Sequence, residues 1–412
     1  MSSNIKKSIL KLKESSTLVI NEKSKDLINQ GKKVYQFGFG QSPFPVPETI
    51  VESLKNHAHR KEYLPIQGLV KLREVISKYL LKKTGNNYPK ENILITPGSK
   101  EAMLLMHIAF KGEIIIPAPG WVSYEPQAQI GSNKVHWLET KRSNNWFPTA
   151  LELEKKIKKV GKKKNIIFIL NSPNNPSGSV CNNLKEIAKV AKKYKLIVLS
   201  DEIYTDLTFK DEYNSISKFY SEFTFITGGL SKWCGAGGWR LGFLAVPPKL
   251  KSFLTSLKSL ASESYSTVNT PTQYAAVEAY EGNYDEYKNK VKGILNAVGN
   301  YVYNNLKSNK VLIKPPQGAF YLMPEFKNTK FKNSSKLCEA ILNETGVAML
   351  PGSDFGFKPK RMLTRLSYTD FDGSKFYNNV KDYNSIDEDM IKEFAPSVVE
   401  GITRLSNWAK NL

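Results

Sequence analysis

The sequence is poor in cysteine and histidine and has no long apolar run, and each shortage excludes a class of protein. The three cysteines are widely spaced along 412 residues, which fits neither a disulfide framework nor a zinc site. Of the four histidines only His57 and His59 are close in sequence, and we expect them at an exposed helix end. The longest apolar runs, such as Ile166 to Leu170, are too short to cross a bilayer. The sequence therefore predicts no metal site and no membrane span.

A secretory signal and a nucleic-acid-binding pattern are also missing. The basic stretch from Met1 to Lys13 lacks an apolar core long enough for a signal peptide, so we expect a cytoplasmic protein. The formal charge of +22 comes mostly from lysines spread along the chain, as in Lys185 to Lys195, and such lysines are typical of solvated helix faces. Without a helix-turn-helix or zinc pattern, this charge predicts a diffuse attraction to polyanions at low salt and no nucleic-acid partner.

The sequence does contain an alternation of short β-rich runs and longer helical patterns, which is typical of a parallel sheet covered by helices on both faces. Several runs are continuously apolar, as expected for strands buried on both faces. Seven strands are predicted, at Asn92–Thr96, Glu113–Ile116, Lys134–Trp137, Ile166–Leu170, Leu196–Ser200, Thr224–Thr227 and Leu241–Val246. Helices are predicted at Ser99–Lys111, Asn183–Tyr194, Ser266–Gly282 and Tyr284–Leu306.

After Lys310 the pattern becomes that of a second, smaller α+β unit. We expect short strands and a closing helix there, at Val311–Lys314, Phe320–Met323, Thr364–Ser367 and Ala395–Leu412. The polar stretch from Tyr377 to Asp389 is predicted to be a surface loop. The fold class that follows is α/β, with a large domain around a mostly parallel seven-stranded sheet and a smaller α+β domain.

Polar residues follow four of the predicted strands of the large sheet. They are Gly98 to Lys100, Asn171 to Gly178, Asp201 to Tyr204, and the pair Ser231 and Lys232. In open α/β sheets, ligands bind outside the carboxyl ends of the strands. Four such segments at one edge predict a binding site.

The segment from Gly228 to Arg240 indicates what that site binds. Lys232 lies on a Gly-rich loop eight residues before Arg240, an arrangement that suits a cofactor with an aldehyde at one end and a phosphate at the other. The amine can form a Schiff base with the aldehyde, while the guanidinium can hold the phosphate in a bidentate fork.

The other motifs add chemistry, although each taken alone has a structural alternative. Ser99 and Lys100 offer backbone N–H groups to a phosphate, or Ser99 simply caps a helix. The Asp201 carboxylate can pair with a protonated ring nitrogen and Tyr204 can donate to a ring oxygen, or Asp201 caps the next helix. Asn175 can donate an amide hydrogen to a ligand, or simply belongs to a tight loop. A cis X-Pro bond in this loop would need support from the tertiary structure.

Two further residues complete the predicted set. Trp121 can stack on an aromatic cofactor or lie in the core. Arg365, in the smaller unit, has a fork that suits a carboxylate, although arginines at strand ends are often surface ion-pair partners.

Together these motifs resemble the aspartate aminotransferase family, that is, class I and II aminotransferases of pyridoxal-phosphate fold type I. The resemblance covers nearly the whole chain and is carried by the following segments: Gly40–Pro45, Tyr63–Arg73, Pro173–Gly178, Asp201–Tyr204, Ser231–Lys232, Gly238–Gly242, Pro316–Tyr321, Pro351–Gly356 and Arg365–Ser367.

The resemblance implies a role for each candidate residue. Lys232 would hold pyridoxal 5'-phosphate as a Schiff base and move the proton of the substrate Cα, with Asp201 against the pyridine nitrogen. Tyr204 and Asn175 would contact the ring oxygen, and Trp121 would stack on the ring. Arg240, Ser231 and the backbone at Ser99 and Lys100 would hold the phosphate. The substrate carboxylate would be bound by Arg365, Asn175 and the backbone at Gly40, and Tyr63 would reach the phosphate in the neighbouring subunit of a homodimer.

It also implies a domain plan and a reaction. Residues 1–45 would join residues 311–412 in the small domain, and residues 46–310 would form the cofactor-binding domain. The expected enzyme transfers the amino group of an α-amino acid to a 2-oxo acid by a ping-pong mechanism. A lyase that performs β-elimination and a non-catalytic sensor or binding protein on the same fold are the alternatives. The amino-acid donor stays open, with aspartate, aromatic, alanine and branched-chain donors all possible.

The sequence departs from the family pattern at three glycines. Gly120 stands where many relatives have an aromatic residue, Gly229 offers no hydroxyl or amide to the phosphate, and Gly237 replaces a threonine. Each is expected to loosen the lining of the site without removing a catalytic group.

Overall fold

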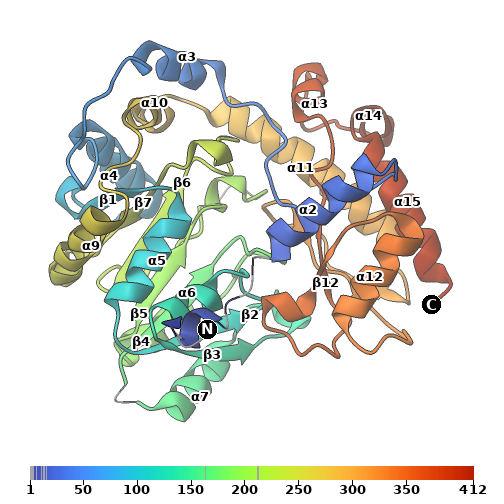
Figure 1. Cartoon of the computed structure of the whole chain (residues 1–412), viewed down its shortest axis with the longest axis horizontal. Coiled ribbons are helices and arrows are strands. Elements are labelled where there is room, and N and C mark those ends of the chain that lie inside the picture. Colours follow the sequence, from blue (N-terminus) through green and yellow to red (C-terminus); the bar gives the residue numbers. More distant parts are fainter. Residues whose placement is uncertain are drawn as a thin grey trace.

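The computed structural model describes residues 4–5, 7–10, 12, 14, 16–162, 164–210 and 213–412, so part of the basic stretch from Met1 to Lys13 lies outside it. A seven-stranded sheet occupies the centre of the larger part of the chain (Figure 1). Its strands are β1 (Ile93–Thr96), β2 (Glu113–Ala118), β3 (Lys134–Glu139), β4 (Ile166–Asn171), β5 (Ile197–Asp201), β6 (Thr224–Gly229) and β7 (Gly242–Ala245). All seven predicted strands are confirmed, with ends that differ by up to two residues.

The strand order is β1-β7-β6-β5-β4-β2-β3. The pairs from β3 through β2, β4 and β5 to β6 are parallel, and β7 runs antiparallel to both of its neighbours. The predicted mostly parallel sheet is thus confirmed.

Helices cover both faces of this sheet because its central strands are apolar on both sides. Along β4, Ile167 and Ile169 pack in one core cluster, while Phe168 and Leu170 pack in another. The first cluster is closed by α5 (Ser99–Ala109), α6 (Tyr124–Ile130) and α9 (Lys251–Ser264), and the second by α7 (Ala150–Val160) and α8 (Leu184–Lys193). Alternation of the side chains along a strand is what divides β4 between two cores.

The helical region departs from the sequence analysis in two places. Helix α9 was not predicted, although Leu254, Leu257 and Ala261 recur at helical spacing and are buried. Helix α10 (Thr270–Glu281) begins four residues later than predicted, because the Asn269 side chain accepts a hydrogen bond from the Thr272 N–H and so caps the helix there.

The remaining helices of the larger part are α3 (Glu48–His57), α4 (Val70–Thr84) and α11 (Asp285–Leu306). Helices α3 and α4 pack against α10, whereas α11 also contacts α13, α14 and α15 (Figure 1). Helix α11 also contacts the 3₁₀ turn Thr205–Leu207 that follows β5, so it links this end of the sheet to the C-terminal part.

The C-terminal part contains two small sheets, one of β8 (Val311–Leu312) and β10 (Glu325–Phe326), the other of β11 (Leu350–Pro351), β12 (Thr364–Ser367) and β9 (Tyr321–Leu322). Its helices are α12 (Ser334–Thr345), α13 (Gly373–Asn379), α14 (Glu388–Phe394) and α15 (Pro396–Lys410). The N-terminal helices are α1 (Lys7–Leu10) and α2 (Ser16–Asn29). Helix α2 lies beside the C-terminal part (Figure 1), and Tyr35 forms a parallel bridge with Val347. The exact domain boundaries stay predictions.

The predicted loop from Tyr377 to Asp389 was wrong at both ends. Its first residues belong to α13 and its last to α14. Val380 is 1% exposed, because this stretch packs on the core instead of lying free on the surface. Among the described helices, none combines the length and the apolar character that a membrane span needs.

Candidate active site

A cavity of about 470 Å³ lies where the carboxyl ends of β4, β5 and β6 face the C-terminal part. It brings together all but one of the predicted site residues: Gly40, Ser99, Lys100, Trp121, Asn175, Asp201, Tyr204, Ser231, Lys232, Arg240 and Arg365. Tyr63 is the exception, because its side chain is 88% exposed and does not line this cavity. Within one chain the structure therefore gathers residues from positions 40 to 365.

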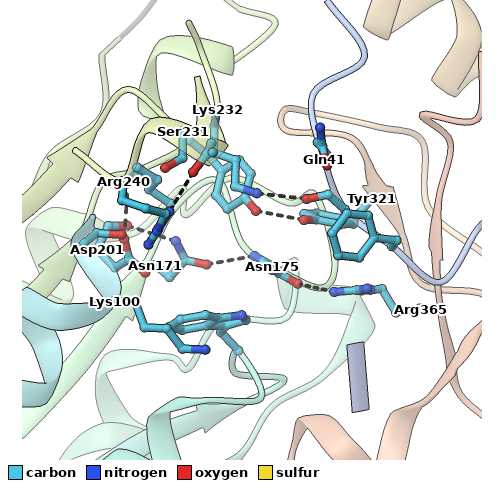
Figure 2. Close-up of a pocket in the computed structure, with 18 of the residues that line it drawn as sticks. Gln41, Lys100, Asn171, Asn175, Asp201, Ser231, Lys232, Arg240, Tyr321 and Arg365 are labelled. Carbon is cyan, nitrogen blue, oxygen red and sulfur yellow. Dashed lines mark hydrogen bonds between the residues drawn. The ribbon is translucent and has the colours of Figure 1, made fainter. Parts of the chain in front are cut away.

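The register of the sheet explains why the strand-end residues meet. Asn171 pairs with Asp201 across β4 and β5, and Asp201 pairs with Thr227 across β5 and β6. Parallel strands in register end at one edge, so the segments that follow them open into the same space. Lys232 follows β6 and points into that space (Figure 2).

The amine of Lys232 is the central cation of the cavity. Its Nζ donates to the carbonyl oxygen of Gly40 at 2.8 Å and lies 5.6 Å from the ring centre of Tyr204. Burial, followed by the positive charges of Arg365 and Arg240, lowers the pKa of Lys232 to about 8, although Asp201 acts in the opposite direction. A lowered pKa leaves more of the amine neutral, and the neutral amine is the form that attacks a carbonyl or accepts a proton.

This lowered pKa predicts a selective pH dependence of labelling. With a pKa of about 8, roughly half of Lys232 is neutral at pH 8, whereas an ordinary lysine near 10.4 is almost fully charged. In protein freed of bound aldehydes with hydroxylamine, reductive methylation of Lys232 should rise with pH through a midpoint near 8. Peptide mass spectrometry would follow it, with the exposed Lys251 as an internal control. Identical pH profiles for the two lysines would contradict the prediction.

Asp201 is a buried carboxylate at the end of β5 and is 4% exposed. Burial raises its pKa to about 6, while the hydroxyl of Tyr124, which donates to Oδ2 at 2.7 Å, the N–H of Ile203 and the charge of Lys232 lower it. A cationic group held against Asp201 would lower this pKa further and keep both charges in place. Asp201 does not cap a helix by its side chain in the described structure; it lines the cavity instead.

A line of hydrogen bonds joins Asp201 to Arg365 across the cavity (Figure 2). The Asn171 amide donates to the carbonyl oxygen of Asp201 at 2.9 Å, and its own oxygen accepts from the N–H of Asn175 at 2.7 Å. The Asn175 oxygen accepts in turn from Nη1 of Arg365 at 3.3 Å. The Ser172–Pro173 bond in this loop is cis, a geometry that the sequence left open. The loop thus fixes the orientation of both amides.

Arg365 is an arginine buried at the end of the site opposite Asp201 (Figure 2). It is 1% exposed, donates from Nη2 to the carbonyl oxygen of Gly38, and stacks over the Tyr321 ring at 4.9 Å. Its Nε is buried without a partner among the described residues. Burial leaves the Arg365 guanidinium poorly solvated and thereby lowers its pKa. The two parallel N–H groups of the guanidinium suit a carboxylate. The surface ion-pair alternative for Arg365 was therefore wrong.

The opposite end of the cavity suits a phosphate. Arg240 has a left-handed φ of 53° and donates from Nη1 to the carbonyl oxygen of Gly237 at 2.8 Å. Gly98 precedes α5 with φ 79°, and a Cβ there would lie 2.3 Å from Nη2 of Arg240. Ser99 therefore does not cap α5; Gly98 does, without a side chain. A glycine at this point leaves the helix N-terminus and the guanidinium close together, which favours an anion.

Sequence reasoning gave no individual role to several lining residues: Leu18, Phe39, Gln41, Ile203, Gly238 and Tyr321. Tyr321 matters most, because its hydroxyl lies 2.8 Å from that of Tyr204 and its ring supports Arg365. A Cβ on Gly40 would come within 2.0 Å of the Tyr321 hydroxyl, so glycine is needed for this approach. Tyr321 lies in the segment Pro316 to Tyr321, which was identified only as a family motif.

The three glycine departures behave differently from one another. Gly237 lines the cavity and a Cβ there would meet nothing closer than 3.5 Å, so the lining is open at this point. Gly120 and Gly229 do not line the cavity, and a Cβ would lie 2.7 Å from Ile116 and 2.6 Å from the Leu241 carbonyl oxygen, respectively. At these two positions glycine permits close packing and does not loosen the site.

The donor set fits a planar, phosphorylated aldehyde. The cavity offers the Lys232 amine with its lowered pKa, the buried Asp201 carboxylate, and a helix N-terminus beside Arg240. It also offers the aromatic ring of Trp121, and the Nζ of Lys100 lies 5.5 Å from the centre of that ring. Elsewhere in the described chain, no cluster of three or more histidine, cysteine, aspartate or glutamate residues could hold a metal.

Comparisons with known proteins agree with this chemistry. The family model of aminotransferase class I and II matches residues 32–372. An aspartate aminotransferase of Thermotoga maritima is 33% identical over 364 residues, covering 86% of this chain and 92% of the relative. An asparagine–oxo-acid transaminase of Streptococcus mutans is 30% identical, covering 87% and 93%.

Solved structures share the fold. The aspartate aminotransferase of Thermus thermophilus with maleate superposes with a TM-score of 0.85 at 23% identity, covering 98% of this chain and 99% of that one. The crystal structure of the Thermotoga maritima enzyme gives 0.82 at 27% identity, covering 98% and 100%.

Proposed function

Since the chain belongs to the class I and II aminotransferases, we propose that its amino donor is a dicarboxylic amino acid, with aspartate as the best candidate. The chain is a pyridoxal-phosphate-dependent aminotransferase. The relatives favour amino-group transfer over the β-elimination and sensor alternatives.

We propose the following roles for the residues of the cavity. Arg240, Ser231 and the N-terminus of α5 hold the phosphate, Asp201 pairs with the ring nitrogen, and Tyr204 donates to the ring oxygen. When bound, pyridoxal phosphate supplies an aldehyde for the amine and an electron sink for the electrons of the substrate Cα–H bond. Arg365 and Asn175 fix the α-carboxylate, and Trp121 covers the ring face.

Lys232 then acts as the base that removes the proton from the substrate Cα. The α-carboxylate fixed at Arg365 holds the substrate Cα near the amine, and Lys232 accepts the Cα proton in its neutral form. Its lowered pKa supports this role because a larger share of the amine is neutral at physiological pH than in an ordinary lysine. Release of the 2-oxo acid before the second substrate enters predicts ping-pong kinetics.

The observation that carries the aspartate proposal is the charge of Lys100. The roles proposed above assign a group of the cofactor or substrate to four of the five charged side chains that line the cavity, namely Asp201, Lys232, Arg240 and Arg365. The side chain of Lys100 is the fifth and has no assigned group. Burial and the nearby Arg240 lower the pKa of Lys100, so a second carboxylate would relieve an incompletely balanced cation. The name of the Thermotoga maritima relative points to the same donor.

A spectral panel tests the donor directly. The purified holoenzyme should show a yellow absorption band that aspartate, added without an oxo acid, converts to the colourless amine form. Asparagine, alanine, branched-chain and aromatic amino acids complete the panel, because the Streptococcus mutans relative is named for asparagine. Conversion by alanine or an aromatic amino acid and not by aspartate would refute the proposal.

A Lys100→Gln substitution should lower kcat/KM for aspartate by about tenfold and that for alanine by less than about twofold, because a charge-assisted hydrogen bond to the second carboxylate is lost. Steady-state kinetics with both donors would measure this. Lys111→Gln, an exposed lysine just beyond α5, is the matched control and should change neither value. Equal losses for both donors would instead place Lys100 on the phosphate.

We also propose a homodimer with shared sites, in the cytoplasm, with residues 1–45 and 311–412 forming the small domain. The 88% exposed Tyr63 supports the dimer, because an aromatic side chain this exposed suits contact with a second copy. Light scattering should give about twice the chain mass of 46.5 kDa.

Tyr63→Ala should weaken retention of the cofactor, because the hydroxyl that reaches the partner's phosphate is removed. Mixing Tyr63→Ala chains with Lys232→Ala chains after denaturation should restore activity, since every mixed dimer carries one site with both residues intact. A monomeric mass, or no restoration in the mixture, would contradict the shared site.

A further inference from the structure

A second cavity, of about 560 Å³, lies away from the active site and shares no lining residue with it. Its walls come from three segments that are distant in sequence: Lys141 with the 3₁₀ turn Arg142–Asn144 after β3, the stretch from the C-terminal end of α11 to the residues that follow β8, and Arg361 before β12. The lining residues are Lys141, Arg142, Ser143, Tyr303, Lys307, Ile313, Lys314, Pro315 and Arg361.

Five of these nine residues are cationic and none is acidic. Glu325 lies beside the cavity and accepts from Nη1 of Arg142 at 3.1 Å and from Nε of Arg361 at 2.9 Å. One carboxylate neutralises at most one of the five charges. The cavity therefore keeps a strong positive potential, which a concave, low-dielectric wall concentrates.

The two arginines are held in fixed positions. Both oxygens of Glu325 are occupied, and the Arg361 guanidinium stacks 5.0 Å from the Trp146 ring and 4.8 Å from the Phe357 ring. Guanidinium groups fixed in this way lose little conformational entropy on binding an anion.

The three lysines of this cavity are not paired with a carboxylate as the two arginines are. In the described part of the chain Lys141, Lys307 and Lys314 form no ion pair with a carboxylate; Lys314 donates to the side-chain oxygen of Asn145, and Lys307 lies 5.4 Å from the Tyr303 ring. Burial and the nearby Arg142 lower the pKa of Lys314. An anion would relieve this repulsion between like charges.

We propose that this cavity is a binding site for a small polyanion, a molecule with two or more phosphate or carboxylate groups. Cations that converge from three walls suit a compact ligand with several charges, whereas an extended polymer follows a charged stripe on the surface. The ligand would tie the turn at Arg142 to Arg361, which lies four residues before the active-site Arg365.

Isothermal titration of the holoenzyme with pyrophosphate and with citrate, each at constant ionic strength, tests the proposal. We expect saturable binding of at least one of the two. The double substitution Lys141→Gln with Lys314→Gln should raise the Kd at least about tenfold. The matched control, Lys82→Gln with Lys251→Gln on α4 and α9, removes the same charge elsewhere and should change the Kd by less than about twofold.

Each outcome decides the matter. Pyrophosphate alone would identify a phosphate ligand, and citrate alone a carboxylate ligand. No saturable binding of either would overturn the proposal. Equal weakening in both double variants would also overturn it, because it indicates diffuse attraction, and so would an unchanged Kd in both, because it indicates binding at the active site. Should the Lys141 and Lys314 variant fail to fold, Lys141→Glu alone, at an exposed position, must weaken binding at least as much.

Discussion

Replacing Lys232 with alanine is expected to abolish transamination and to leave the chain folded. The side chain is half-buried at the cavity wall and makes one hydrogen bond, to the carbonyl oxygen of Gly40, so its loss removes little packing. It removes both the nucleophile for the cofactor aldehyde and the base for the Cα proton, and losses of such groups cost at least about 10³-fold in kcat. Single-turnover kinetics and the visible spectrum would measure the loss.

The Lys232→Arg variant tests whether the positive charge at position 232 is sufficient for activity without a nucleophilic and basic amine. Arginine keeps the positive charge near Tyr204, but its guanidinium stays protonated in proteins and cannot act as a nucleophile or base. We expect this variant to be as inactive as Lys232→Ala, with an unchanged thermal unfolding midpoint. Substantial transamination by either variant would refute the assignment of Lys232.

Replacing Asp201 with asparagine should lower kcat/KM by about 10²- to 10³-fold, the range for removal of one preorganised electrostatic partner. Asparagine has nearly the shape of aspartate but cannot keep a ring nitrogen protonated, so the electron sink weakens. The same change should lower the pKa of Lys232, because Asp201 is the group that raises it. Steady-state kinetics and the labelling profile of Lys232 would report the two effects independently.

Two neighbouring substitutions provide controls for Asp201. Tyr124→Phe removes only the 2.7 Å hydrogen bond to Asp201 and should cost about tenfold or less, as expected for one bond to a charged group. Glu202→Gln alters a carboxylate that is also buried but does not line the active-site cavity, because its hydrogen bonds run to Ser200, Tyr213 and Ser215. A loss at Glu202 as large as that at Asp201 would attribute the effect to stability and not to catalysis.

The sheet could be predicted because its signal is local. The runs Ile166–Leu170 in β4 and Ile197–Leu199 in β5 are continuously apolar, as expected of strands buried on both faces. The beginning of α10 was missed because it depends on one hydrogen bond from the Asn269 side chain, and the loop after Tyr377 was misjudged because polar composition does not reveal which residues pack on a core.

The sequence by itself determined which strand-end residues meet in the cavity. Asp201 ends β5, and Asn175 and Lys232 follow β4 and β6. These three strands are parallel and end at a common edge, so the convergence of the residues follows from local patterns alone.

Only the tertiary structure decided what closes the site. Tyr321 and the burial of Arg365 come from a part of the chain more than 80 residues beyond Arg240, and no local pattern indicates that the Tyr321 hydroxyl meets Tyr204 or that Arg365 lies 1% exposed. The same holds for the basic cavity, whose five cations are unremarkable surface residues in the sequence. Burial, pKa and the balance of charge depend on which distant segments pack together, and packing is a property of the whole fold.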